Sequence, residues 1–139
     1  MANNIQFSIA IHIMAALACG CDKDITSRVL AASVNTSPSF VRRILAKLSK
    51  AGLVETATGK AVKCWLAKDP KKISLLDIYR AVDAPRAFAI HDYAEQKACL
   101  VSCNIKSALD KTLEKTQTAM ESSLKQMSLA QMAAAVNKK

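Results

Sequence analysis

Residues 37–54 read SPSFVRRILAKLSKAGLV, and this stretch decides the fold. Ser37 is a favourable N-cap, and Pro38 stands at the first helical position, where its missing N–H costs nothing. Gly52 supplies a stop signal just past the last turn. Apolar residues at i, i+3, i+4 and i+7 predict one buried stripe: Val41, Ile44, Leu45 and Leu48. The stretch therefore predicts a helix of roughly three to four turns that is packed along one side.

The opposite face of this predicted helix is cationic. It contains no Asp or Glu and consists of Ser39, Arg42, Arg43, Ala46, Lys47 and Lys50. A charged helix face is usually only solvated, so its neighbours in the sequence must decide its role.

Those neighbours complete a known pattern. Residues 25–36, ITSRVLAASVNT, predict a shorter helix that ends in a tight turn at Asn35 and Thr36. The apolar residues of this helix are Val29, Leu30, Ala32 and Val34. Two short helices joined by such a turn form a helix-turn-helix. Residues 53–57 and 62–67 then predict two short strands around a turn at 58–60, which makes the unit a winged helix.

The remaining elements frame this unit. A nearly all-apolar helix is predicted for residues 4–19, a Ser74-capped helix for residues 75–82, and a packed irregular segment for residues 86–98. Residues 104–127 predict a long helix with one apolar stripe and little of its own chain to pack on. The simplest way to bury this stripe is to pack it against the same helix of a second chain. The expected dimer seam consists of Ile105, Leu109, Leu113, Met120 and Leu124.

Charge is unevenly distributed along the 139 residues, whose formal net charge is +9. Residues 1–72 hold 11 Lys/Arg against 4 Asp/Glu, whereas residues 73–139 hold 9 against 7. The cationic half contains the predicted helix-turn-helix, and double-stranded DNA is its natural partner. An anionic membrane is the alternative, but the basic helix backs onto a core and presents no free apolar face.

The N-terminal region carries no secretion signal, since no basic region precedes an apolar run and cleavage site. Residues 5–19 are apolar-rich but too short to span a bilayer. We therefore expect a cytoplasmic protein with no membrane partner.

Three consecutive blocks carry a family resemblance: SPSFVRRILAKLSKAGLV (37–54), LAKDPKKISLLDIYRAVD (66–83) and AIHDYAEQKACLVSCNI (89–105). In this order they resemble the Rrf-two family of bacterial winged-helix transcription regulators, of the IscR, NsrR and CymR type. The resemblance implies a homodimer that binds a two-fold operator, often with cysteine-linked sensing. The hairpin departs from the family pattern, because GKAVKCWLA (59–67) stands where relatives carry a glycine-rich tip ending in Gly-Tyr-Arg-Leu.

The candidate DNA-binding residues lie in the helix-turn-helix and the hairpin. We expect Arg42, Arg43 and Lys47 in the major groove, and hairpin lysines near phosphate or the minor groove. The full set is Thr36, Ser37, Ser39, Arg42, Arg43, Lys47, Lys60 and Lys63.

The five cysteines read as thiols and not as a structural disulfide set. Cys99 and Cys103 form an i, i+4 pair and are the candidate sensing residues. Relatives that hold an iron–sulphur cluster use three cysteines in this segment, so a cluster here would need a ligand from elsewhere, such as His91 or a partner chain. We therefore expect no cofactor, and a cluster stays open as an alternative with an incomplete cysteine set. A thiol switch and buried cysteines without a sensing role both remain open.

These parts define the expected organisation. The fold class is mainly α with a small β-hairpin wing, made of a winged helix-turn-helix DNA-binding domain and a long C-terminal dimerisation helix. The expected divisions are a DNA-binding domain (1–83), a linker and sensing segment (84–103), and the dimerisation helix with its tail (104–139).

No catalytic constellation is evident, such as a Gly-rich phosphate loop or a nucleophile elbow, so we do not expect an enzyme. The expected function is a DNA-binding transcription regulator that acts as a homodimeric repressor on a two-fold operator, and the sequence leaves open whether it responds to thiol oxidation. The alternative is a protein-interaction or scaffold module that uses the long helix without specific operator binding.

Overall fold

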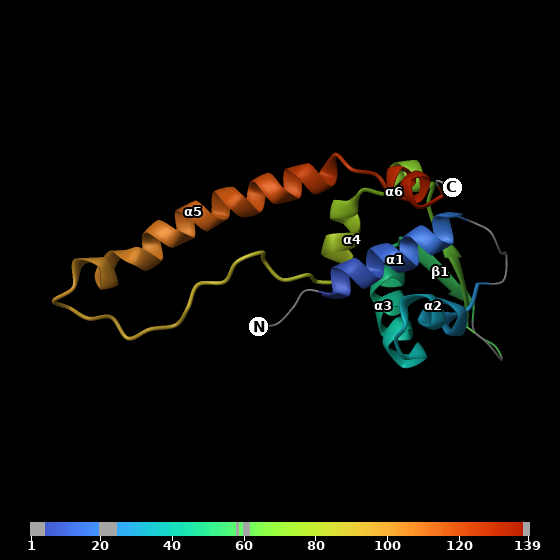
Figure 1. Ribbon diagram of the computed structural model, residues 1–139, viewed down its shortest axis with the longest axis horizontal. Helices are drawn as coiled ribbons and strands as arrows, with labels where there is room; N and C mark the ends of the chain where they lie inside the picture. Colours follow the sequence, from blue (N-terminus) through green and yellow to red (C-terminus); the bar gives the residue numbers. More distant parts are fainter. Residues whose placement is uncertain (1–4, 20–24, 58, 60–61, 138–139) are drawn as a thin grey trace.

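The computed structural model of the chain describes residues 5–19, 25–57, 59 and 62–137. It consists of a winged-helix body and a long projection, which we call the antenna (Figure 1). The antenna comprises the irregular residues 84–99, which lead outward, and a long helix that returns. The elements in order are α1 (Ile5–Cys19), α2 (Ser27–Val34), α3 (Pro38–Lys50), β1 (Val54–Ala57), β2 (Lys63–Leu66), the 3₁₀ turn η1 (Pro70–Lys72), α4 (Leu75–Ala81), α5 (Leu100–Lys125) and α6 (Leu129–Val136). This order confirms the predicted mainly α fold with a small hairpin.

Helix α3 has the ends and the buried face that the sequence predicts. The Ser37 side chain accepts a hydrogen bond from the Phe40 N–H at 3.3 Å, which caps the first turn. Gly52 adopts φ +78°, and the Leu53 N–H donates to the Leu48 carbonyl at 3.0 Å, which closes the last turn. All four stripe residues are buried, namely Val41, Ile44, Leu45 and Leu48.

Helix α2 confirms the predicted turn but not the predicted face. Asn35 takes the left-handed conformation at φ 66°, which asparagine tolerates, and α3 begins three positions later. Val29 and Ala32 were expected to pack, but both are exposed. The buried residues are Ser27, Leu30 and Ala31, because a small serine occupies the first position of the stripe.

The hairpin is held against the start of α2. Strands β1 and β2 pair antiparallel, with Val54 opposite Leu66 and Glu55 opposite Trp65. The Cys64 N–H donates to the Ile25 carbonyl at 3.0 Å, so the outer edge of β2 is also paired. This pairing fixes the wing relative to the helix-turn-helix.

The core of the body is aliphatic, as expected. It is centred on α1 and α3 and includes Ile13, Met14, Leu30, Ile73 and Ile78, all at most 1% exposed. Helix α4 begins after Ser74, the predicted cap. Asp77 adds a capping box that was not predicted, because the two residues exchange hydrogen bonds.

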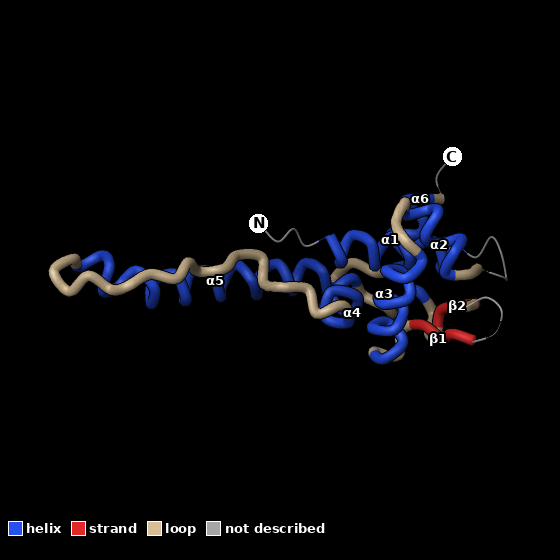
Figure 2. Tube along the Cα trace, turned by 90° about the horizontal axis from the view of Figure 1, so that it is seen from below, coloured by secondary structure: helices blue, strands red, loops and turns tan. Residues whose placement is uncertain are grey.

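The chain returns to the body after the antenna. The Leu75 N–H donates to the Met127 carbonyl at 2.9 Å, and the Leu129 N–H donates to the Ile73 carbonyl at 2.8 Å. Leu129 is fully buried, and α6 packs on α1 (Figure 2). Residues 129–136 lie in the range expected for the dimerisation helix and tail, yet they contribute to the core of the winged helix.

The antenna differs from expectation in two ways. Helix α5 begins at Leu100 and not at Asn104, because Cys99 serves as the N-cap and accepts from the Ser102 N–H at 3.4 Å. Residues 86–98 are irregular as predicted, but Phe88 is 59% exposed where a packed residue was expected. In the two views the irregular segment runs beside α5, and most residues of both are exposed (Figures 1 and 2).

Candidate nucleic-acid interface

The polar face of α3 presents free cations. Arg42, Arg43 and Lys50 are exposed, and among the described residues none of the three has an ion-pair partner. Helix α3 contains no acidic residue, so its positive potential is not neutralised locally. Such a face can bind phosphate groups, or donate hydrogen bonds to the acceptor atoms of base edges.

The N-terminal end of α3 brings hydroxyl groups beside one of these arginines. The Ser37 and Ser39 Oγ atoms lie 3.2 Å apart, and both residues are exposed. The Arg43 guanidinium lies over the Phe40 ring, with its central carbon 5.2 Å from the ring centroid. Stacking orders the guanidinium, and an ordered fork suits bidentate recognition. Thr36, another candidate, is half-buried in the turn before α3.

Lys47 is placed differently from the two arginines. It is half-buried, and its Nζ donates to Gln6 Oε1 of α1 at 3.3 Å. The ammonium group therefore lies at the side of the basic face that borders α1.

A groove separates α3 from the hairpin. Its volume is about 440 Å³, and it is lined by Arg42, Leu45, Ala46, Ser49, Lys50, Thr56 and Val62. Lys50 and Thr56 were not among the candidate residues. The sequence carries a signal for Lys50, which stands seven positions after Arg43 on the same helical face, but none for Thr56, whose place depends on how the hairpin docks.

The hairpin contributes one described lysine. Lys63 is exposed in β2, whereas Lys60 lies outside the described residues. Trp65 is 45% exposed, and its indole N–H donates to Glu55 Oε2 at 2.8 Å, while the neighbouring Cys64 points into the core. The outer face of the wing therefore presents an aromatic ring that is held by a carboxylate.

The cysteines occupy different environments. Cys64 is buried, its Sγ donates to the Ile25 carbonyl, and burial raises the pKa of its thiol to about 11. Cys99 and Cys103 are exposed at the start of α5. The pKa of the Cys103 thiol is raised by local desolvation and then by the nearby Glu95 carboxylate. Cys64 is thus a packing residue, while the candidate sensing pair is accessible.

The described residues of a single chain do not fit an iron–sulphur cluster. Across the described part of the chain, no three His, Cys, Asp or Glu side chains are grouped so that they could hold a metal ion. His91, the suggested extra ligand, stacks on Tyr93 with 5.1 Å between ring centroids. The Cys103 thiol instead donates to the Gln96 carbonyl at 3.5 Å.

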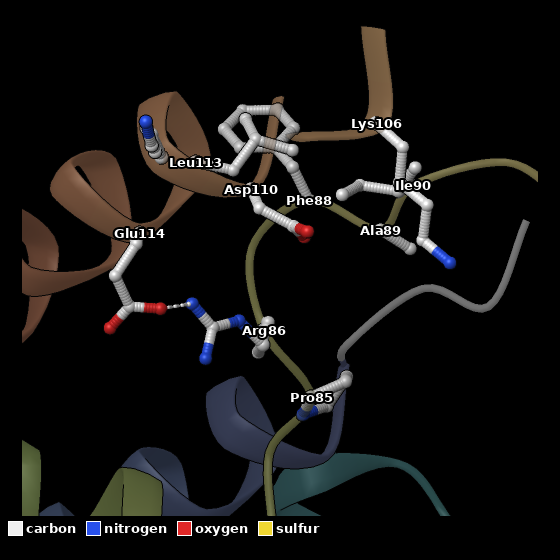
Figure 3. Close-up of a pocket in the computed structure, with 10 residues that line it drawn as sticks. Pro85, Arg86, Phe88, Ala89, Ile90, Lys106, Asp110, Leu113 and Glu114 are labelled. Atoms are coloured by element: carbon white, nitrogen blue, oxygen red, sulfur yellow. Dashed lines mark hydrogen bonds and ion pairs between the residues drawn. The ribbon is translucent and has the colours of Figure 1, made fainter. Parts of the chain in front are cut away.

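The expected seam residues of α5 are all half-buried in the single chain: Ile105, Leu109, Leu113, Met120 and Leu124. A hollow of about 880 Å³ lies between residues 85–90 and α5. Figure 3 shows Phe88 and Leu113 approaching each other from the two elements, with Arg86 paired to Glu114 at one side. Part of the stripe is thus covered by the chain's own irregular segment.

No helix in the described ranges is both long and apolar enough to cross a bilayer.

Comparisons with known proteins agree with this geometry. The model of the Rrf2 family, described as iron-dependent transcriptional regulator, matches residues 4–135. The chain is 40% identical over 127 residues to YwnA of Bacillus subtilis (strain 168), named as an HTH-type transcriptional regulator, and the match covers 91% of this chain and 92% of YwnA.

Solved structures share the fold over nearly the whole length. A crystal structure described as that of a DNA-binding protein is 38% identical with a TM-score of 0.71, and the match covers 91% of this chain and 97% of that one. The structure of IscR from T. potens is 21% identical with a TM-score of 0.71, and the match covers 99% of this chain and 89% of IscR. The family and YwnA are described as transcriptional regulators and not as enzymes. The chain belongs to the Rrf2 (Rrf-two) family of winged-helix, DNA-binding transcription regulators.

Proposed function

We propose that the protein is a homodimeric repressor that acts in the cytoplasm and reads a two-fold operator with α3. One observation carries this proposal: the exposed face of α3 holds cations without acidic partners, next to a groove bounded by the hairpin. Occupancy of an operator within a promoter is sufficient for repression, and the proposed surface supplies that occupancy.

The surroundings of each residue suggest its role. Arg43, which is ordered by Phe40, is proposed to contact guanine in the major groove. Arg42 and Lys50 border the groove beside the hairpin, and each is proposed to hold one phosphate. The remaining proposed backbone contacts are Thr36, Ser37, Ser39, Lys47, Lys60 and Lys63.

The proposed dimer forms along α5. Leu100 and Val101 at its start are 80% and 65% exposed, and the five seam residues are only partly covered within one chain. Burial of this surface against a second copy would remove apolar area from water. A two-fold axis along the seam would then place two α3 helices on two related half-sites.

The proposed signal is a peroxide-class oxidant that converts the exposed thiols of Cys99 and Cys103 to sulphenic acids and is itself reduced to water. The Cys99 Sγ accepts the Ser102 N–H, and Cys103 donates to the Gln96 carbonyl, so both sulphur atoms take part in starting α5. Oxidation of either thiol would change these bonds, which supports a link between thiol chemistry and the helix that carries the seam.

Selection of binding sites from random DNA tests the proposal. The wild-type protein should enrich a two-fold sequence and shift it with an affinity that falls steeply with salt. Arg43→Ala should lose this shift, while Lys115→Ala, a control on the exposed side of α5, should keep it. If no sequence is enriched and the protein remains dimeric, the scaffold alternative holds and the proposed repressor function is wrong.

A further inference from the structure

A single polar side chain is buried where the antenna joins the body. Gln117 is 5% exposed and is the one residue of the described α5 whose side chain is buried. It lies four positions after Leu113 and three before Met120, so it occupies a position of the apolar stripe. A buried glutamine loses hydration that only well-made hydrogen bonds restore, so its partners define its role.

The Gln117 amide uses both its donor and its acceptor group. Its Oε1 accepts from the Ala87 N–H at 3.0 Å. Its Nε2 donates to the Tyr79 hydroxyl at 3.1 Å and to Glu121 Oε2 at 3.2 Å. One side chain therefore joins α5 to α4 and to the irregular segment that leaves the body.

Tyr79 extends this connection into the winged helix. Its hydroxyl donates to the Pro85 carbonyl, and its ring packs edge-on against Phe7 of α1 with 5.2 Å between centroids. Helix α4 also packs on α3. The polar network thus fixes the direction of the antenna relative to the helix with the basic face.

Two exposed ion pairs lie at the edge of this junction. Arg80 of α4 contacts Glu121 at 3.4 Å, and Arg86 pairs with Glu114 (Figure 3). Exposed ion pairs contribute little to stability. The Leu75–Met127 backbone hydrogen bond holds the end of the antenna, and the buried amide is the second point of attachment that sets its direction.

We propose that Gln117 is a positioning residue that sets the spacing between the two half-sites of the operator. This inference rests on the proposed α5 dimer. If the seam joins two antennae, the angle between each antenna and its body determines the distance between the two α3 helices. Gln117 and Tyr79 fix that angle, although neither residue is proposed to touch DNA.

A rotation at the junction moves the DNA-reading helix and not the seam. If the two antennae stay joined along the seam, a rotation at Gln117 turns each body, and the α3 helix that it carries, about that junction. A rotation of about 10° would displace α3 by roughly 1.7 Å for every 10 Å that separates α3 from Gln117, against a rise of about 3.4 Å per base pair.

The same network could serve stability alone, and the experiment must separate the two roles. Gln117→Met keeps the length of the side chain and removes both the donor and the acceptor. Tyr79→Phe keeps the ring on Phe7 and removes the hydroxyl. Gln126→Met is the matched control, because it makes the same replacement at an exposed position after the last turn of α5.

The measurement is affinity for a set of duplexes that differ only in spacing. An operator selected with the wild-type protein is shortened or lengthened by one or two base pairs between its half-sites. Wild type and Gln126→Met should each prefer the selected spacing by at least tenfold. Gln117→Met and Tyr79→Phe should lose that preference or shift it by a base pair, with unchanged binding to an isolated half-site and unchanged dimerisation in sedimentation.

Each outcome decides the question. A Gln117→Met dimer that keeps the wild-type spacing preference overturns the inference and leaves the proposed function intact. A Gln117→Met protein that fails to fold is judged through Tyr79→Phe by the same criterion. If the wild type selects no two-fold site at all, the proposed function fails, and the positioning role of Gln117 fails with it.

Discussion

Replacing Arg42 and Arg43 one at a time should weaken DNA binding in two different ways. The two residues are adjacent, but their side chains have different neighbours. Arg42 borders the groove between α3 and the hairpin, together with Lys50, and Arg43 stacks on Phe40 near the N-terminal end of α3. Loss of a phosphate contact changes the salt dependence of affinity, whereas loss of a base contact lowers the affinity for the correct sequence.

The magnitudes follow from the number of contacts in a dimer. If Arg42 and Lys50 each neutralise one phosphate per chain, the dimer releases counterions from about four sites. They contribute about −3.6 to the slope of log affinity against log salt. Arg42→Ala should reduce the size of that slope by about 1.8. The DNA affinities of the variant and the wild type should therefore become more similar as the salt concentration is raised.

Arg43→Ala should leave the slope nearly unchanged and lower the affinity for the correct sequence. A lost bidentate contact costs about 1–3 kcal/mol for each half-site. For the dimer this corresponds to a loss of at least about 30-fold for the operator. Nonspecific DNA should bind the variant about as well as it binds the wild type.

Fluorescence anisotropy at several salt concentrations, with operator and scrambled duplexes, provides the assay. Thermal unfolding serves as a control, because both residues are exposed and neither replacement should change stability by more than about 0.5 kcal/mol. Equal slopes for wild type and Arg42→Ala would refute the phosphate assignment. If Arg43→Ala binds the operator as tightly as the wild type, α3 is not the helix that recognises the base sequence.

Three further predictions concern the antenna and the cysteines. Leu113→Glu would bury a charge on both sides of the proposed seam, so sedimentation should find a monomer and operator binding should be lost. Thr118→Glu adds the same charge at an exposed position, and this control should stay dimeric. A Leu113→Glu protein that stays dimeric would place the interface elsewhere. Cys99→Ser and Cys103→Ser should each abolish an oxidant-dependent change in operator affinity while keeping the reduced affinity, and equal affinities of oxidised and reduced wild type would make both residues merely structural. The pKa of Cys64 is raised to about 11, so the unfolded thiol ionises first as pH rises, and the free energy of unfolding should fall by about 2–3 kcal/mol from pH 9 to 11. Chemical denaturation measures the free energy of unfolding at each pH, and in Cys64→Ala its decrease should be smaller by that amount. If the free energy of unfolding depends on pH in the same way in wild type and Cys64→Ala, the burial of this thiol is contradicted.

The parts of the fold that local sequence signals determine were predictable. Caps such as Ser37 and Ser74, the left-handed stop at Gly52 and the stripe of α3 are properties of a few neighbouring residues, and the structure confirms them. The start of α5 was placed too late because cysteine is a rare N-cap, although Cys99 fills that position.

Long-range packing explains what the sequence could not provide. The burial of Leu129 depends on the return of α6 to α1, which is separated from it by the whole antenna. The role of Gln117 has no signal in the sequence, because a polar residue in an apolar stripe looks like an interruption until its partners on α4 are known. The position of Lys47 depends likewise on Gln6, a residue of a different helix.

The return of the chain at Met127 has a topological consequence. The residues just before α4 and the residues just after α5 are joined side by side, through the Leu75–Met127 and Leu129–Ile73 backbone hydrogen bonds. Topologically, the antenna is an insertion within a domain and not an appendage at its end. Helical turns could therefore be added to or removed from the arm while the body keeps both of its attachment points. Such a change would alter the distance between paired binding sites without changing the residues that are proposed to read them.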